Sequence, residues 1–273
     1  ELFGRRFHAE QITARDVIVL RRPVMGPKGK SGAAPVSVDL DAFKFRLLTR
    51  PAFSGAEGDF DVTGAYEMAR QGGQKAKIAA ASRLHVGDRL DVDFDLGRTR
   101  SLRLLADATE ANGGAIAGAL GLPADRTFDL KAKAEGTTSR AAFDIVARSG
   151  REIPLEARGA WNEQGGSARG RLDLDASRLT QRLAQMFGPS ADFTLAGRKA
   201  TADGLSALKI NINSENLILR GEGLADLAKR RTGPEGIAFT AQVGALGRIV
   251  SIPKMGRGEA QGAFRLIDGG FVV

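Results

Sequence analysis

Apolar and polar residues alternate with a period of two through most of this chain. The stretch 90–97, LDVDFDLG, places an aspartate between successive apolar residues, and 128–134, FDLKAKA, does the same with Asp and Lys. Successive residues of a strand face opposite sides of a sheet, so each such stretch has one apolar and one polar face. The pattern therefore predicts many strands that share a one-sided sheet.

Glycine-rich turn signals separate these stretches. Examples are SGAEG, RQGGQ, NEQGGS and TADG, and the chain contains 35 glycines in all. Strands that follow one another through short turns pair with their chain neighbours in antiparallel fashion. We therefore expect an all-β fold built as an antiparallel meander.

Three short segments interrupt the alternation and predict helices. They are 113–123, 177–189 and the basic segment 224–234. In the second of these, Ser177 is placed as an N-cap, and Gly-Pro at 188–189 ends the helix. Its apolar residues fall at helical spacing: Leu179, Leu183, Met186 and Phe187.

Composition restricts the class of protein. Apolar residues make up 42% and charged residues 26% of the chain, which is typical of a folded domain. The net charge of +8 is scattered, so it indicates a solvated surface rather than a nucleic-acid site. The absence of cysteine excludes disulfides, thiolate nucleophiles and cysteine zinc sites. No apolar run approaches the roughly 18–20 residues needed to span a bilayer.

The aspartates of 90–97 do not form a calcium loop. Asp91, Asp93 and Asp95 have the spacing of calcium ligands, but an EF-hand then requires Gly at position six and Glu at position twelve. Those positions are Leu96 and Leu102. We therefore interpret the three carboxylates as a water-facing row, and we expect no metal.

Other candidate chemistry fails in the same way. The sequence GKS at 29–31 lacks the preceding glycine of a phosphate-binding loop, since that position is Val24, and a strand pattern follows it. The two histidines, His8 and His85, lie near no Ser/Asp constellation, and no G-x-S-x-G is present. We therefore expect a non-enzymatic protein without cofactors.

The aromatic residues also argue against nucleic acid as a partner. A sheet that stacks bases needs exposed aromatic rings among basic side chains on one face. Most phenylalanines here fall in the apolar phase, away from the charges: Phe94, Phe128, Phe143, Phe193, Phe239 and Phe264.

Several segments, taken in order, resemble the TamB proteins of Gram-negative bacteria, members of the AsmA-like superfamily. They are EANGGAIAGALGLP, TFDLKAKAEG, and the long stretch from IPLEARGAWNEQGG to FGPSADFTLAGRKA. The early VIVLRRP, followed by a loop at 23–35 and VSVDLDAFKF, is similar to the N-terminal half of such proteins. The resemblance covers most of the chain through diffuse motifs.

The resemblance implies an elongated antiparallel β-groove (a "β-taco") with an apolar concave face and two or three short helices. It implies a periplasmic protein, anchored in the inner membrane by a segment outside this sequence, that carries phospholipid or supports outer-membrane protein assembly with a TamA-type β-barrel. The chain begins with Glu1 rather than Met. We expect residues 1–273 to form a single segment of such a groove, with 23–35 as a mobile loop.

A one-sided sheet presents a physical problem, because water would contact its apolar face. Roughly 15 strands spaced ~4.8 Å apart would make an apolar stripe about 70 Å long. Soluble monomers rarely expose apolar patches larger than a few hundred Å². We expect phospholipid acyl chains to cover the face. The predicted lining residues are Val92, Phe94, Leu104, Leu130, Phe143, Ile145, Leu172, Leu174, Phe193, Leu195, Ile210, Ile212, Leu217, Leu219, Phe239 and Phe264.

Two alternative functions remain open at this point. A protein-assembly scaffold would bind unfolded outer-membrane clients by pairing with them at a strand edge. A β-solenoid adhesin or enzyme would instead have a closed core packed with large side chains.

Overall fold

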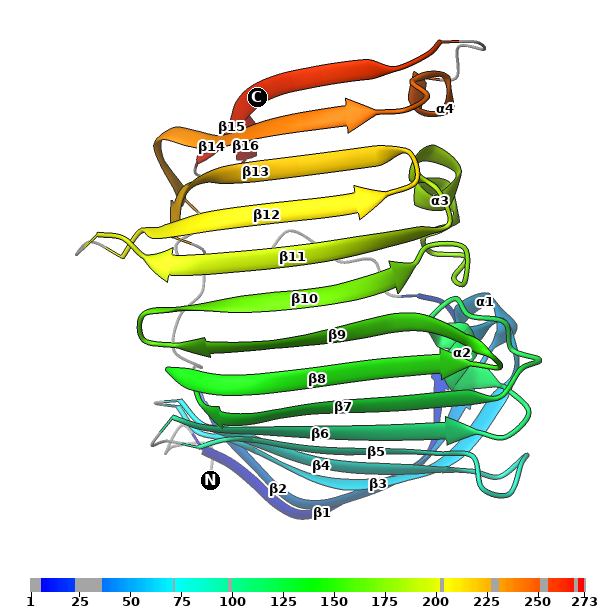
Figure 1. Ribbon diagram of the computed structural model, residues 1–273. Helices are drawn as coiled ribbons and strands as arrows, with labels where there is room; N and C mark the ends of the chain where they lie inside the picture. The colour runs from blue at the N-terminus through cyan, green and yellow to red at the C-terminus, as the bar shows by residue number, and fades with distance from the viewer. Residues whose placement is uncertain are drawn as a thin grey trace. The chain divides into compact units, whose positions relative to one another are not determined.

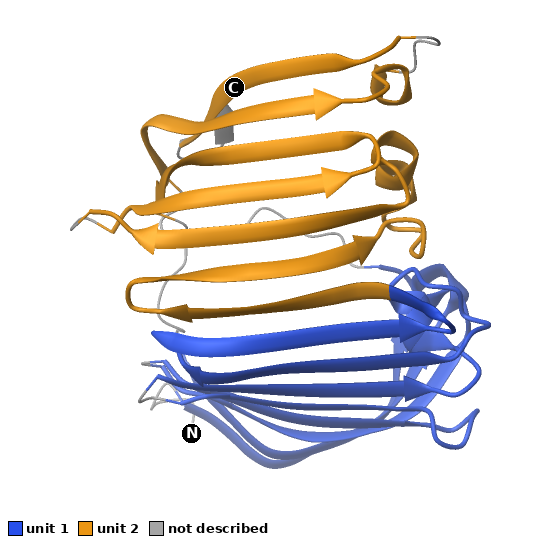
Figure 2. Ribbon diagram, in the orientation of Figure 1, with its two compact units in different colours: residues 1–153 blue, residues 154–273 orange. Residues whose placement is uncertain are grey.

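The fold is described from a computed structural model, for residues 6–22, 36–70, 72–97, 100–201, 204–226, 231–250, 255–267 and 270–272. The loop predicted at 23–35 lies outside these residues. The chain divides into two compact units, Glu1–Ile153 and Pro154–Val273, which are coloured separately in Figure 2. Each unit is built from strands with two short helices, so the predicted all-β class is confirmed (Figure 1).

In unit 1, eight strands pair in chain order within one sheet. From β2 to β8 every neighbouring pair is antiparallel, as the alternation with short turns predicts. The elements are β1 (Arg6–Val19), β2 (Ser37–Thr49), α1 (Pro51–Ser54), β3 (Gly58–Met68), β4 (Gln74–Ser82), β5 (Arg89–Leu96), β6 (Ser101–Glu110), α2 (Ala115–Ala119), β7 (Phe128–Thr137) and β8 (Arg140–Ser149).

In unit 2, the strands again pair in chain order, and all described pairs are antiparallel. The elements are β9 (Glu152–Asn162), β10 (Gly165–Asp173), α3 (Gln181–Phe187), β11 (Ser190–Lys199), β12 (Ser206–Ser214), β13 (Leu217–Asp226), β14 (Arg231–Val243), α4 (Gly247–Val250), β15 (Gly258–Ile267) and β16 (Gly270–Val272). Unit 2 contains all of β9 except its first two residues.

One strand pair departs from the antiparallel prediction. β1 runs parallel to β2, with Phe7 opposite Val38 and Val17 opposite Leu47. Parallel neighbours need a connection that returns to the starting end of the strands. The sequence pattern of a loop between two strands does not distinguish this return from a simple turn.

The helices differ in number and detail from the prediction. The helices expected in 113–123 and 177–189 are present as α2 and α3. The prediction of a helix in 224–234 is wrong. Residues 224–226 end β13 and residues 231–234 begin β14. The two additional helices, α1 and α4, have four residues each. Such single turns are too short for helical periodicity to reveal.

The start of α3 and its buried face also need correction. The N-cap is Thr180 rather than Ser177, and Ser177 Oγ instead accepts a hydrogen bond from the Leu179 N–H at 3.1 Å. Leu179 and Leu183 of the predicted stripe are 58% and 42% exposed, whereas Ala184 is buried. The small side chain faces the rest of unit 2 because the helix packs closely there.

All helices of a unit lie at the same end of its strands. α1 joins β2 to β3 and α2 joins β6 to β7, and these two helices contact each other. In unit 2, α3 joins β10 to β11 and α4 joins β14 to β15, and they also contact each other. An even number of antiparallel strands lies between the two helices of a pair, which is why both emerge at one end.

Fully buried apolar residues are few, and they concentrate near the strand ends. In unit 1, Phe60, Val62, Ala80 and Ala115 form a buried cluster with α2 over the sheet. In unit 2, several buried apolar residues lie beside α3 or at the opposite strand ends: Leu174, Ala176, Ala184, Leu205 and Ala225. Ala157 and Ile237 are buried within β9 and β14. Most of the larger apolar side chains in the middle of each apolar face are half-buried.

Candidate functional site: the apolar face of each sheet

The strand register of unit 1 joins the apolar positions into rows that cross several strands. One row runs from Val92 through Ala106 and Ala132 to Ile145, because these residues are opposite one another on β5 to β8. A second row contains Phe94, Leu104, Ala134 and Phe143. Directly opposed residues of antiparallel strands share a face, so the apolar face continues across the unit.

Unit 2 repeats this arrangement with larger side chains. One row contains Phe193, Ile212, Leu219 and Ala241, on β11 to β14. A neighbouring row contains Leu195, Ile210, Gly221 and Phe239. Leu195 is 43% exposed although it lies in the middle of its strand.

Aromatic rings on these faces lie over glycines of the adjacent strand. The Phe43 ring occupies the space where a side chain of Gly64 would stand, and Phe239 is placed similarly against Gly262. Such pairing shields a strand backbone that has no side chain of its own. The ring also projects little above the sheet, because it lies across the neighbouring strand.

Fifteen of the sixteen predicted lining residues lie on an apolar face of a strand, and fourteen of these are half-buried. Leu195 is more exposed than the others. Leu174 is the one predicted lining residue that lies outside a strand, since β10 ends at Asp173. The Asp173 carboxylate accepts hydrogen bonds from the N–H groups of Asp175 and Ala176, and this turn buries Leu174. Its predicted place in a strand is therefore wrong.

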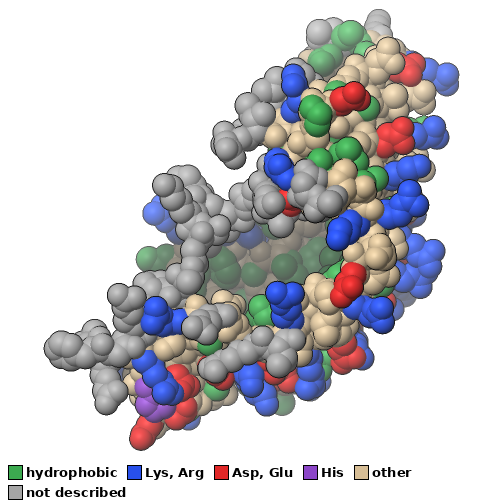
Figure 3. All heavy atoms as spheres, turned by 90° about the vertical axis from the view of Figure 1, so that its left-hand side faces the viewer, with side chains coloured by type: hydrophobic (Ala, Val, Ile, Leu, Met, Phe, Trp, Pro, Cys, Tyr) green, Lys and Arg blue, Asp and Glu red, His purple; other side chains and the backbone are tan. Residues whose placement is uncertain are grey.

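The opposite face carries the charges. Lys75, Arg89 and Arg103 approach the carboxylates of Asp95, Asp91 and Asp93 at 3.9, 3.6 and 3.7 Å, respectively. Cations from the neighbouring strands β4 and β6 and from β5 itself thus lie beside the aspartate row, in keeping with its interpretation as a polar sheet face. Figure 3 shows the separation: charged side chains gather on one side of the strands and hydrophobic side chains on the other.

Glu110 fixes the helical end of unit 1, and sequence reasoning missed it. Its carboxylate is buried and accepts hydrogen bonds from the N–H groups of Ile116 and Ala117 at 2.8 and 2.7 Å, at the start of α2. Burial raises the pKa of Glu110 above its ordinary value of 4.5, and these two hydrogen bonds oppose the rise. Glu110 lies on the apolar face beside Phe128, where alternation alone predicts an apolar residue.

Asn216 has the corresponding role in unit 2. Its buried side-chain amide donates to the carbonyl oxygen of Met186 at 2.7 Å, and its carbonyl oxygen accepts from the Ala245 N–H at 2.6 Å. One side chain thereby joins α3, the β12–β13 turn and the segment before α4. An Asn in a turn is common in sequences, so nothing local signals these distant partners.

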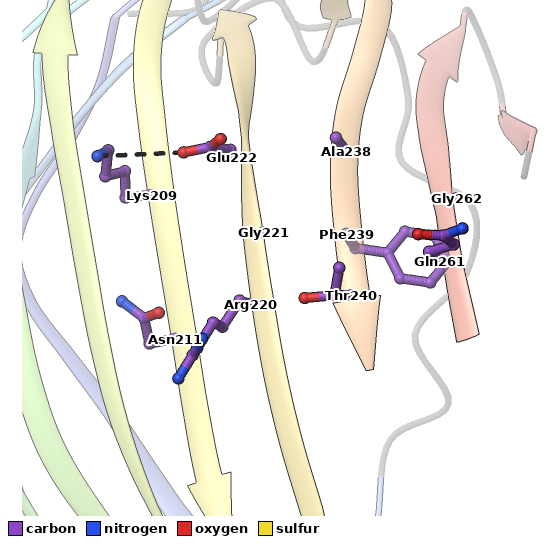
Figure 4. A pocket seen from close by; sticks show the side chains of 10 residues that line it. All are labelled: Lys209, Asn211, Arg220, Gly221, Glu222, Ala238, Phe239, Thr240, Gln261 and Gly262. Carbon is purple, nitrogen blue, oxygen red and sulfur yellow. Dashed lines mark ion pairs between the residues drawn. The ribbon is translucent and has the colours of Figure 1, made fainter. Parts of the chain in front are cut away.

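A cavity of about 720 Å³ lies on the charged face of unit 2, between β12 and β15. Figure 4 shows its lining side chains, including the Lys209–Glu222 ion pair with a 4.0 Å separation. Arg220 and Asn211 face each other across paired strands. Of the predicted lining residues, Phe239 alone contributes to this cavity. The cavity therefore lies mainly on the charged face, although Gly221, Phe239 and Gly262 also line it.

Comparisons with known proteins add no assignment. No family model matches the sequence, and no curated protein and no solved structure matches it either. Within the described ranges, no helix combines the length and the hydrophobicity required to cross a bilayer. The fold defines a class: an all-β protein whose antiparallel strands build one-sided sheets with helices at one end.

Proposed function

We propose that this chain is a non-catalytic segment of a TamB-type lipid-transport protein, whose apolar sheet faces hold phospholipid acyl chains. The observation that carries the proposal is the incomplete cover of those faces. Leu195, in the centre of β11, is 43% exposed, and the rows around it are half-buried. The described strands of each unit belong to one sheet rather than to two stacked layers.

The energetics favour a bound apolar partner. Burial of apolar surface contributes about 25 cal/mol per Å², so each ~100 Å² left in water forgoes about 2.5 kcal/mol. The helices of each unit lie at the strand ends and leave the middle of the face uncovered. Acyl chains need no site-specific chemistry and would supply these contacts.

On this proposal the chain works in the periplasm of a Gram-negative bacterium. The inner-membrane anchor and the contact with a TamA-type outer-membrane barrel would come from regions outside this segment. Head-groups would remain in water, where the charged positions of the strand ends are available to them.

Photo-crosslinking tests the proposal with adjacent residues that face opposite sides. A crosslinking amino acid at Phe143 or Ile210 should capture phospholipid in cells, whereas one at Ala142 or Lys209 should not. Native mass spectrometry of the purified segment should detect bound lipid. Capture of protein alone at all four positions, with no lipid in the purified segment, would refute the proposal.

A charge on the apolar face provides a second test. Ile212→Asp should lower the lipid content, because an ionised carboxylate is costly to cover with acyl chains. Asn213→Asp places the same charge one residue away on the other face, and it should leave the lipid content unchanged.

Protein-assembly scaffolding is a second candidate, and β1 favours it. This strand has 14 residues, and among the described strands it pairs with β2 alone. A free strand edge can bind an extended peptide through its unpaired backbone groups. Proline substitutions along β1 should then abolish binding of unfolded outer-membrane clients and leave the lipid content unchanged.

A further inference from the structure

Three potential metal ligands meet on the polar face where β1 and β2 begin. His8 of β1 is in register with Asp39 of β2, and Asp41 lies two residues further along the same strand. The His8 Nδ1 atom is 3.3 Å from Asp39 Oδ2, and the His8 Nε2 atom is 3.9 Å from Asp41 Oδ2. One ligand atom from each of the three residues lies within 4.8 Å of the others.

The two carboxylates have different surroundings, which suggests different roles. Asp39 accepts a hydrogen bond from Arg6 Nη2 at 2.7 Å, so its position is already fixed by a cation. A histidine that binds metal usually donates its other ring N–H to a carboxylate, which sets the tautomer and the orientation of the ring. Asp39 is placed to accept from Nδ1 of His8. The lone pair of Nε2 then faces the carboxylate of Asp41.

The separation of these two atoms suits one shared ion. Zinc binds histidine nitrogen and carboxylate oxygen at ~2.0–2.2 Å, so two ligands at a tetrahedral angle are about 3.4 Å apart. The observed 3.9 Å requires only a small side-chain movement, and both side chains are partly exposed. Water is available for the remaining positions.

We propose that His8 Nε2 and the Asp41 carboxylate bind a zinc-class divalent cation that links β1 to β2, with Asp39 as the residue that positions His8. A mixed nitrogen and oxygen ligand set favours Zn²⁺, Ni²⁺ or Cu²⁺ over Mg²⁺ or Ca²⁺. The site requires no lipid and no partner protein, so it is independent of the proposed function.

Such an ion would strengthen the attachment of the edge strand. Four large apolar side chains of β1 are exposed, so their burial contributes little to holding this strand: Phe7, Ile12, Val17 and Ile18. A ligand that binds the folded arrangement alone stabilises it in proportion to its occupancy. The cation would therefore fasten the strand pair at the end where residues 6–8 enter the sheet.

Calorimetric titration of the chain with Zn²⁺ tests the site. The wild type should bind one ion, and His8→Ala should abolish binding. Asp41→Asn, which keeps the side-chain shape, should weaken binding at least about tenfold, and Asp39→Asn about 10- to 100-fold. His85→Ala is the matched control, because it removes the other histidine of the chain, which has one carboxylate, Asp88, beside it at 3.4 Å.

Circular dichroism must show that each variant keeps its strand content. Failure of the wild type to bind Zn²⁺, or binding that survives both His8→Ala and Asp41→Asn, would overturn the proposal. Loss of binding in His85→Ala alone would do so too.

Limited proteolysis provides a positional readout. The Arg15 side chain is 98% exposed in the middle of β1, which makes it accessible to trypsin. Zn²⁺ should slow cleavage after Arg15 several-fold in the wild type and in His85→Ala, but not in His8→Ala. Equal protection in all three proteins would contradict a link between β1 and β2 through His8.

Discussion

The ring of Phe193 lies over Gly170 of the neighbouring strand. A Cβ atom added to Gly170 would stand 2.7 Å from Cζ of that ring and would also collide with the backbone oxygen of Glu156. The two residues are opposite each other in the register of β10 and β11. Glycine at this position therefore sets the position of the ring on the apolar face of unit 2.

Gly170→Ala should destabilise unit 2 by ~1–3 kcal/mol, because the ring and the strand backbone must both shift. Chemical denaturation monitored by circular dichroism measures this change. The matched control is Gly221→Ala on the same face, where a Cβ would have ordinary contacts of 3.6 Å or more. The control should stay within about 0.5 kcal/mol of the wild type. Equal losses in the two variants would show that Phe193 is not held by Gly170.

The raised pKa of Glu110 predicts that its contribution to folding stability declines as pH rises. Burial raises the pKa of this carboxyl in the folded state, so the folded protein binds the proton more tightly than the unfolded chain does. The contribution of Glu110 is therefore fully present below its ordinary pKa of 4.5 and is lost as pH rises through the folded-state value. Glutamine resembles the protonated carboxyl and does not titrate, so the melting temperatures of the wild type and Glu110→Gln should be similar near pH 4.5, and the wild type should fall below the variant as pH rises to 8. A wild type that gains stability relative to the variant as pH rises would contradict this sign.

The lowered pKa of Asp59 predicts the opposite dependence of folding stability on pH. Arg46 donates from Nε and Nη2 to its two oxygens at 2.8 and 2.7 Å, and these hydrogen bonds hold the pKa of Asp59 below its ordinary value of 3.8. The stabilisation is present above pH 3.8 and is lost as pH falls through the lowered pKa. Asp59→Asn should lower the melting temperature modestly at pH 7 and have no effect in strong acid. Asp61→Asn, at a more exposed carboxylate, serves as the control.

The hydrogen bonds of Asn216 predict that its removal destabilises α3 and the segment before α4 together, at the helical end of unit 2. Asn216→Ala removes hydrogen bonds to Met186 and Ala245 and leaves partly buried backbone groups without them. The expected cost is ~1–3 kcal/mol. Asn213→Ala, on an exposed position of β12, should be near neutral. Hydrogen exchange should show faster opening of both α3 and the segment before α4 in Asn216→Ala alone. Faster exchange confined to one of them would argue against a shared anchor.

The strand pattern was predictable because each side of the sheet imposes its own chemistry on alternate residues. Phe94 and Asp93 occupy opposite faces as the period of two requires. The parallel β1, the single-turn helices and the position of Leu174 were not predictable, because they depend on a long connection, on packing and on one side-chain turn. Glu110 and Asn216 escaped prediction for a related reason, since their partners lie on other elements.

Within the described residues, helices begin at positions 51, 115, 181 and 247, so successive starts are 64, 66 and 66 residues apart. Each interval contains four strands. An even number of antiparallel strands returns the chain to the same strand end and keeps its apolar side chains on the same face. A gene could thus grow by whole multiples of about 65 codons and preserve the alternation of faces. Duplication of such a module offers a simple route from a short ancestor to a longer series of strands.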